Sequence, residues 1–167
     1  MGNILVHQSG RLEFAGKHYR CALGRGGLSA DKHEGDGATP VGSWPLRRVL
    51  YRPDRLPPPH TALDVAPGRT DDGWCDDPRH ADYNLPVTLP HAASCERLWR
   101  EDSLYDIIVV LGHNDNPVVA DAGSAIFLHI ARDDYGPTEG CVALAENDLR
   151  EVLAAAERGC ILEVCGE

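Results

Sequence analysis

A histidine and a cysteine twelve positions apart are the residues best suited to do chemistry together. His129 stands in the apolar run Ala125–Ile130, and Cys141 follows Gly140 at the end of a polar loop. A free thiol has a pKa of about 8.5, so it needs a base within hydrogen-bonding reach to act as a nucleophile at neutral pH. Gly140 lacks a Cβ, so a substrate carbonyl can approach the backbone N–H of Cys141. The spacing indicates a Cys141 nucleophile with His129 as its base, although buried packing roles are as common for such residues.

The sequence around this pair resembles the L,D-transpeptidases with a YkuD-type catalytic domain. The family signature is a His at a strand end, a loop, and then Ser/Thr-His-Gly-Cys before an apolar residue. It is matched by five residues: His129, Thr138, Gly140, Cys141 and Val142. Three further blocks are similar to a short proteobacterial branch of the family: Asp31–Gly42, Gly112–Asp115 and Gly123–His129. The resemblance extends from about Cys21 to Ile161.

The resemblance implies one domain, residues 1–167, that is mainly β and sandwich-like, with a few peripheral helices. It also implies peptidoglycan stem peptides as donor and acceptor, no cofactor, and inhibition by carbapenems. Cys141 would attack the carbonyl of an L-centre to form a thioester, which an amine of diaminopimelate would resolve. His129 would take the thiol proton, with its ring oriented by the carbonyl of Ile130, while the N–H groups of Gly140 and Cys141 hold the oxyanion. The product would be a 3,3 link, or a 1,3 link with L-alanine as donor.

Three departures from the family pattern affect the expected site. Glu139 replaces the usual second His, Ala143 replaces a common Arg or Asn, and the loop from His129 to Cys141 is short. An anion beside Cys141 would raise the pKa of the thiol, so Glu139 is expected to turn away, toward Arg132 or a substrate amine.

The missing basic residue leaves the substrate carboxylate without its usual partner. Replacement candidates are Arg25, Lys32 and Arg132. The other candidate substrate-binding residues are Thr138, Glu139, Tyr135, His113 and Trp74. Trp74 could offer a flat surface to a glycan or peptide stem together with Tyr83.

Three alternatives remain open at this stage. Water as acceptor would make the same site an L,D-carboxypeptidase or endopeptidase. The changes at Glu139 and Ala143 would also fit a non-catalytic peptidoglycan-binding domain. A zinc protein would need His113, His129 and Cys141 to converge, and the six cysteines show no CxxC or other zinc-type spacing. We therefore expect no metal.

Composition and charge argue against some kinds of partner and location for this protein. The net charge of -10 argues against a nucleic-acid partner, because such binding needs clustered cations. No apolar run is long enough for a membrane span, and a monomer is expected. Residues Met1–His7 lack the pattern of a secretion signal. Since peptidoglycan lies outside the cytoplasm, we expect a periplasmic location by function, with a cytoplasmic one left open.

The elements that must position the pair are mostly short strands. The alternating and continuous apolar runs predict strands at Ile4–Val6, Arg11–Phe14, Lys17–Ala22, Trp44–Tyr51, Leu104–Leu111, Ala125–Ile130 and Ile161–Val164. Helices are predicted at Ala92–Arg100 and Glu146–Glu157. The charged loop Asp31–Gly42 is expected to form one wall of the cleft.

Overall fold

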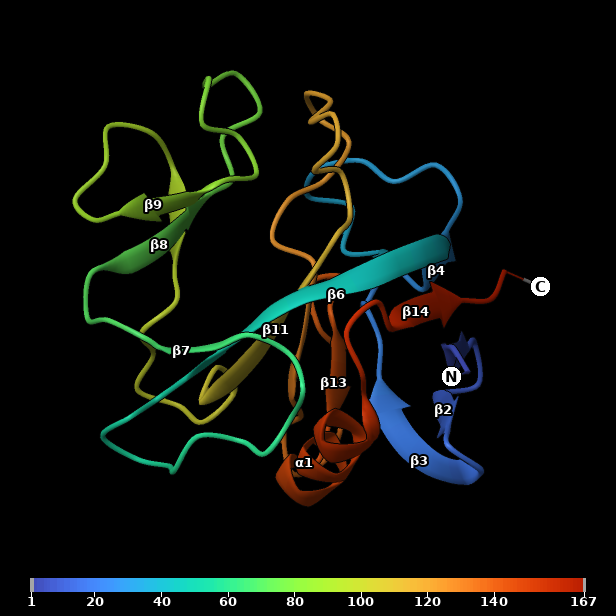
Figure 1. The fold of residues 1–167 in the computed structure, drawn as a ribbon. Coiled ribbons are helices and arrows are strands. Elements are labelled where there is room, and N and C mark those ends of the chain that lie inside the picture. Colours follow the sequence, from blue (N-terminus) through green and yellow to red (C-terminus); the bar gives the residue numbers. More distant parts are fainter. Residues whose placement is uncertain (1, 167) are drawn as a thin grey trace.

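A β-sheet that closes on itself forms the centre of the molecule. In the computed structural model, which describes residues 2–166, eight strands follow one another around the ring in the order β11-β12-β13-β3-β2-β1-β14-β6, and β6 pairs back with β11 (Figure 1). Their bounds are β1 Ile4–His7, β2 Arg11–Phe14, β3 Lys17–Ala22, β6 Gly42–Tyr51, β11 Ile107–Leu111, β12 Phe127–Ile130, β13 Val142–Leu144 and β14 Ile161–Val164. The ring is therefore barrel-like.

The long strand β6 closes the ring because it pairs with two different neighbours. Its residues 42–45 pair with β14, and its residues 46–51 pair with β11. A short strand, β7 (Val65–Pro67), extends the sheet beside β6.

The interior of the ring is apolar, as the sequence runs require. Every residue of β11, β12 and β13 is buried. The helix α1 (Glu146–Ala155) packs three buried side chains, Leu149, Val152 and Leu153, into the same core. In Figure 1 it lies below β13, at one end of the ring.

A parallel pair of neighbouring strands in the ring positions the two residues singled out in the sequence. Strands β12 and β13 run parallel, and His129 is in register with Ala143. Residues two apart in a strand share a face. Cys141, two residues before Ala143, therefore lies beside β12 on the face that carries His129.

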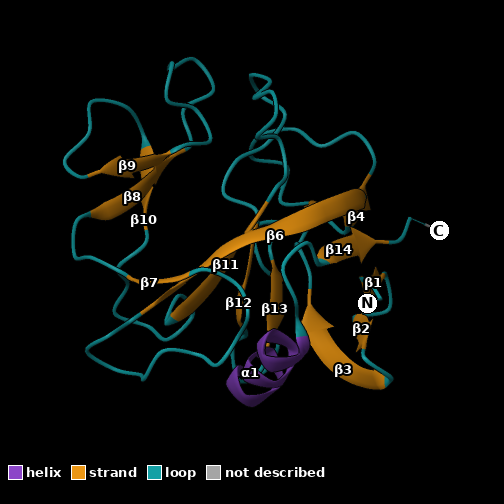
Figure 2. Ribbon diagram, viewed as in Figure 1, coloured by secondary structure: helices purple, strands orange, loops and turns teal. Residues whose placement is uncertain are grey.

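A separate three-stranded sheet stands to one side of the ring (Figure 2). It consists of β8 (Asp72–Cys75), with β9 (Pro86–Thr88) and β10 (Cys95–Arg97) on either side. Trp74 of β8 packs edge-on against Phe127 of β12, with 5.1 Å between ring centroids, and joins this sheet to the ring. The two-residue strands β4 (Leu28–Ser29) and β5 (Thr39–Pro40) pair with each other as a third sheet.

The mainly β fold and the predicted strands are confirmed, and the helix predicted at Glu146–Glu157 is present. The helix predicted at Ala92–Arg100 is wrong, because this segment pairs its backbone with β8 as strand β10. Among the described residues α1 is thus the one α-helix, and the expected sandwich-like sheets form a closed ring. None of the helical structure described here is long and apolar enough to span a bilayer.

Candidate active site

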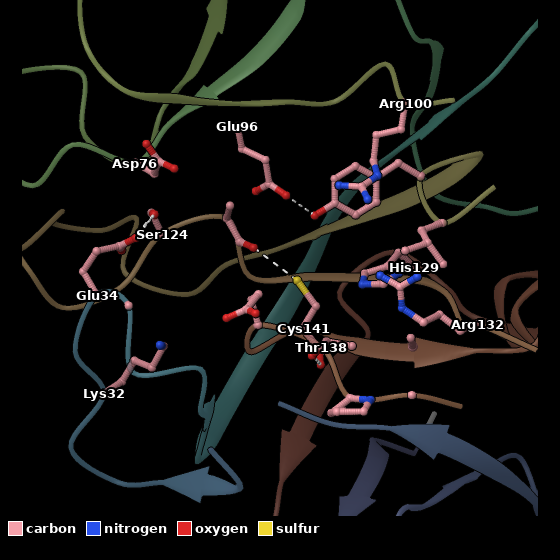
Figure 3. Close-up of a pocket in the computed structure, with 18 residues that line it drawn as sticks. Lys32, Glu34, Asp76, Glu96, Arg100, Ser124, His129, Arg132, Thr138 and Cys141 are labelled. Carbon is pink, nitrogen blue, oxygen red and sulfur yellow. Dashed lines mark hydrogen bonds between the residues drawn. The ribbon is translucent and has the colours of Figure 1, made fainter. Parts of the chain in front are cut away.

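A cavity of about 370 Å³ opens where the β12–β13 connection meets the smaller sheet and the loop before β5 (Figure 3). Cys141 and His129 both line this cavity. The predicted wall from the segment Asp31–Gly42 is confirmed, since Lys32 and Glu34 line it as well. The structure therefore brings together residues that are more than a hundred positions apart.

Cys141 is largely buried but borders the cavity. Its thiol donates a hydrogen bond to the carbonyl of Ala125 at 3.3 Å, and its sulfur accepts one from the N–H of Phe127 at 3.4 Å. Among residues 2–166 no hydrogen bond joins this thiol to His129. The thiol must therefore turn away from Ala125 before it can pass its proton to the imidazole.

His129 is held in one tautomer. Its Nδ1 lies 2.8 Å from the carbonyl oxygen of Ile130, which can only accept a hydrogen bond, so Nδ1 carries the proton. The other ring nitrogen, Nε2, keeps its lone pair. The carbonyl of Ile130 thus orients the ring as the sequence led us to expect, and leaves the imidazole ready to accept a proton.

Burial keeps both groups neutral. It lowers the pKa of His129 to about 4, against the opposing effect of the bond to Ile130. It raises the pKa of Cys141 to about 12, and the negative charge of Glu96 acts in the same direction. At neutral pH the site therefore holds a thiol and a neutral imidazole, so the thiolate can form only as its proton is transferred.

A family comparison agrees with this geometry. The model of the L,D-transpeptidase catalytic domain (YkuD) matches residues 4–164, which is nearly the whole chain. The chain belongs to the L,D-transpeptidase family. No curated protein and no solved structure gave a match.

The turn before the cysteine of this L,D-transpeptidase domain is fixed by Thr138. Its hydroxyl donates to the carbonyl of Cys141 at 2.6 Å and accepts from the N–H of Gly140 at 3.1 Å. Gly140 has φ +137°, and a Cβ there would lie 2.8 Å from the carbonyl oxygen of Ala38. Only glycine fits this position. Because the N–H of Gly140 is already engaged, the N–H of Cys141 is the better placed of the two predicted oxyanion donors.

Glu139 lines the same cavity as Cys141, and its carboxylate is paired with Arg25. The two side chains form an ion pair at 2.8 Å, and the carboxylate side chain is 80% exposed. Arg132, named as an expected partner, is not involved. Arg25 does not line the cavity and is thereby removed from the candidates for the substrate carboxylate.

The anion that does affect Cys141 is Glu96, which no sequence pattern singled out. Glu96 lies on β10, and the Tyr105 hydroxyl donates a hydrogen bond to its carboxylate. The ring of Tyr105 lies edge-on to His129, with 5.1 Å between the ring centroids. Tyr105 therefore links the base, His129, to a partly buried carboxylate at the cavity.

Charges of both signs line the cavity in this L,D-transpeptidase domain. Figure 3 shows Glu34, Asp76 and Glu96 on one side of Cys141, together with Lys32, and Arg100 and Arg132 on the other. Arg100 is paired with Asp102.

The remaining cations at the cavity differ in availability. Lys32 is paired with Asp36. Within the described part of the chain, the guanidinium of Arg132 has no hydrogen bond or ion pair. It is the cation best placed to receive a carboxylate.

Four aromatic or imidazole residues considered in the sequence lie outside the cavity lining. Trp74 is buried, with its Nε1 donating to Asn84 at 2.9 Å, and Tyr83 is buried with its hydroxyl on Glu34 at 2.6 Å, so neither offers a flat surface to a glycan. His113 is buried edge-on against Trp44 at 4.8 Å.

Tyr135, the fourth of these residues, lies under the guanidinium of Arg20 at 4.3 Å. The rings of Trp74, His113 and Tyr135 are engaged elsewhere in the fold and do not line the cavity, so the structure gives no support to their predicted substrate contacts. The zinc alternative fails with His113, which does not join His129 and Cys141 at the cavity.

Because the imidazoles of His113 and His129 are buried, we expect the free energy of unfolding to fall in mild acid. Burial lowers the pKa of His113, like that of His129, to about 4, whereas both histidines have a pKa near 6.5 in the unfolded chain. Below pH 6.5 the unfolded state therefore binds more protons than the folded state, so the free energy of unfolding falls until about pH 4. A difference of one pKa unit is worth about 1.4 kcal/mol, which gives roughly 3 kcal/mol for each histidine over this window.

Urea denaturation at pH 7.5, 6.0 and 4.5 measures this effect. His113→Gln removes one of the two titrations, so its unfolding free energy should depend on pH about half as steeply as that of the wild type. Equal stability of the wild type at pH 7.5 and 4.5 would contradict the buried, neutral state of these rings.

Proposed function

We propose that this chain is a peptidoglycan L,D-transpeptidase that works through a thioester on Cys141. The observation that carries the proposal is the shared cavity, which is lined by both Cys141 and the oriented, neutral imidazole of His129. A nucleophile, a base within the same cavity and a third group that orients the base are the parts that acyl transfer needs.

The first half of the reaction forms the acyl-enzyme. The thiol of Cys141 rotates from the carbonyl of Ala125 toward His129, and its sulfur attacks the carbonyl carbon of an L-centre in the donor stem. The proton passes to Nε2 of His129 and then to the nitrogen of the leaving group as the C–N bond breaks. The N–H of Cys141 supports the negative charge on the carbonyl oxygen.

The second half releases the product. The amine of diaminopimelate on an acceptor stem attacks the thioester, its proton passes to His129, and the sulfur leaves and regains a proton from the imidazole. Glu34 and Asp76 line the side of the cavity on which an incoming ammonium group is favoured by charge. The proposal covers both a 3,3 link and a 1,3 link with L-alanine as donor.

Incubation of the purified protein with disaccharide-peptides, followed by mass spectrometry, tests the proposal. We expect a thioester-linked donor on Cys141 and dimers whose masses and fragments assign the link. Shortened stems without dimers would show hydrolysis instead, as in a carboxypeptidase or endopeptidase. No turnover and no adduct would favour a non-catalytic peptidoglycan-binding domain.

A carbapenem provides an independent chemical test of the same sulfur. Its β-lactam carbonyl would acylate Cys141, so a mass increase by one intact drug molecule is expected on the peptide that contains this residue. Because the polymer lies outside the cytoplasmic membrane, we also propose that the enzyme acts in the periplasm.

Arg132 is proposed as the partner of the donor carboxylate, in place of the basic residue that Ala143 replaces. Its guanidinium lines the cavity and is unpaired among the described residues. A hydrogen bond to a charged group is worth roughly 1.5–3 kcal/mol, so Arg132→Gln should lower kcat/KM by about tenfold to a hundredfold, mainly through KM. Arg158→Gln, which alters an exposed cation that pairs with Asp64 away from the cavity, serves as the matched control. Equal kcat/KM for Arg132→Gln and the wild type would reject this role.

A further inference from the structure

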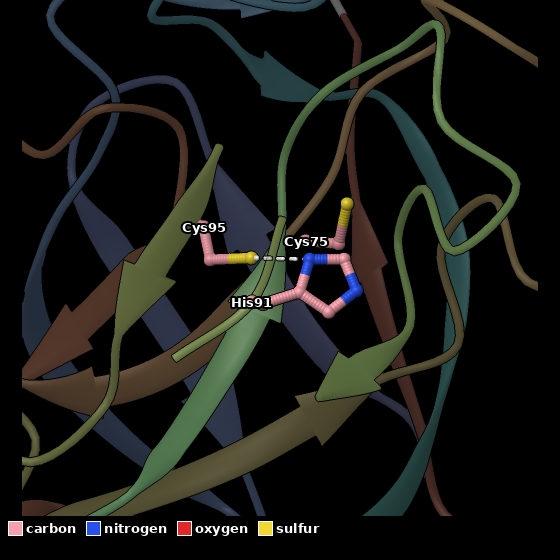
Figure 4. Close-up of side chains that lie close together, drawn as sticks. All are labelled: Cys75, His91 and Cys95. Carbon is pink, nitrogen blue, oxygen red and sulfur yellow. Dashed lines mark hydrogen bonds between the residues drawn. The ribbon is translucent and has the colours of Figure 1, made fainter. Parts of the chain in front are cut away.

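A second group of reactive side chains lies on the small sheet, outside the cavity lining. Cys75 of β8 and Cys95 of β10 are directly opposite each other in the antiparallel pair, and both are free thiols (Figure 4). The backbone hydrogen bond belongs to the next residue pair along the two strands: the N–H of Asp76 donates to the carbonyl of Ser94 at 3.1 Å. The two cysteines therefore form a non-hydrogen-bonded pair, in which side chains approach most closely.

His91 completes the group. One ligand atom from each of Cys75, His91 and Cys95 lies within 4.8 Å of the other two. Nδ1 of His91 is 3.5 Å from the Cys95 sulfur. In a tetrahedral zinc site with Zn–S near 2.3 Å and Zn–N near 2.0–2.1 Å, these two atoms would be about 3.6 Å apart. His91 Nδ1 and the Cys95 sulfur are thus already separated by the distance that a shared zinc ion requires, and the Cys75 sulfur lies within 4.8 Å of both.

The other side of the His91 ring has the partner that a metal-bound histidine commonly has. Nε2 lies 2.9 Å from a carboxylate oxygen of Asp82, which can only accept, so Nε2 carries the proton. Nδ1 is then the nitrogen with the lone pair, and it accepts a hydrogen bond from the N–H of Ala93 at 3.1 Å. A metal ion at Nδ1 would replace this last contact.

We propose that Cys75, Cys95 and His91 bind one zinc ion, with a solvent molecule as the fourth ligand. Two thiolates and an imidazole favour zinc over magnesium or calcium, which prefer oxygen ligands. Binding releases the two thiol protons to solvent, and Asp82 holds the histidine ring from behind.

A second ligand group shares His91 but combines it with His80 and Asp82. It is the weaker candidate, because Nδ1 of His80 already accepts a hydrogen bond from the N–H of Asp82 at 3.0 Å and no sulfur takes part. His80→Ala therefore separates the two arrangements.

The position of the zinc site suggests what the ion does. Successive residues of a strand point to opposite faces. Trp74 and Glu96, the neighbours of the two cysteines, point the other way, toward Phe127 and Tyr105. The ion would clamp β8 to β10 on one face while the opposite face supplies Glu96 to the active-site cavity.

Metal binding is measured on the whole chain, reduced with a phosphine and freed of metal by a chelator. After addition of zinc and gel filtration we expect one zinc per chain, a raised midpoint of thermal unfolding, and, with cobalt instead, a thiolate-to-cobalt charge-transfer band. Cys95→Ser, Cys75→Ser and His91→Ala should each reduce the bound zinc at least tenfold. Cys160→Ser, a buried thiol elsewhere in the core, should retain it, as should His80→Ala and Cys141→Ala.

Three outcomes overturn the proposal. The first is the absence of bound zinc in the reduced wild type. The second is unchanged binding in both Cys95→Ser and His91→Ala, which test the site even if the buried Cys75→Ser does not fold. The third is a Cys75–Cys95 disulfide in the protein from cells together with no zinc uptake after reduction. None of these results depends on transpeptidase activity, so each is distinct from a failure of the proposed function.

Discussion

Replacing Cys141 by alanine is expected to abolish both the covalent donor adduct and the cross-linked product. No other thiol lines the cavity among the described residues, and the N–H group that would support an oxyanion belongs to the same residue. Loss of a covalent nucleophile removes a complete reaction path, so the rate should fall by at least about a thousandfold. Intact-mass spectrometry after exposure to donor or carbapenem should show no added mass.

The controls for this variant are two other cysteine substitutions. Cys21→Ala and Cys160→Ala remove buried thiols away from the cavity and should retain the adduct, provided that circular dichroism shows a folded chain. Product formation by Cys141→Ala at more than a tenth of the wild-type rate would eliminate the thioester mechanism.

Replacing His129 by glutamine is expected to have the second largest effect. With the pKa of the thiol raised to about 12, the thiolate fraction at pH 7 is about 10⁻⁵, so direct ionisation cannot support turnover. A positioned base typically contributes 10²–10⁴-fold, and a loss of about this size is expected in the rate of acylation. The remaining acylation by His129→Gln should rise about tenfold with each pH unit as thiolate forms.

The wild type should behave differently with pH. Because burial lowers the pKa of His129 to about 4, the imidazole stays neutral over the whole range above pH 5, and the acid limb of acylation should lie near pH 4 rather than 6.5. His113→Gln alters an imidazole that does not touch the cavity and should keep the wild-type acylation profile at pH 6–8. An acid limb near pH 6.5 in the wild type would contradict the buried, neutral base.

The central pair was predictable because its geometry is local. His129 ends one strand, Cys141 precedes the next, and a parallel β pair places both on one face after a short connection. The contact of the Ile130 carbonyl with the ring is between adjacent residues, so sequence alone suggested it. The closed ring was harder to predict from the sequence, because it depends on β6 pairing with both β14 and β11.

Glu96 and Tyr105 could not be found in this way. Glu96 falls in a segment whose apolar spacing predicts a helix, and only pairing with β8 makes it a strand that reaches Tyr105. Trp74 was misjudged in the opposite direction. An aromatic residue in an acidic loop suggests an exposed binding surface, whereas its indole packs against Phe127 in the structure. Cross-strand and inter-sheet contacts between distant segments decide both cases.

The cysteines illustrate the same limit. Cys75 and Cys95 are twenty positions apart with no CxxC spacing, so counting residues between them predicts no metal site. The hairpin-like return of the chain through β9 places them opposite each other, and His91 reaches them from the segment just before β10.

The closed ring also constrains how the chain reaches its native state. β14 lies between β1 and β6, so the ring keeps a gap until Ile161–Val164 have left the ribosome. Until then the backbone groups of β1 and β6 that face this gap have no strand to pair with, and such open edges can recruit strands from other chains. Closure of the ring therefore waits for β14, and it depends on protection of two unpaired edges until that strand is available.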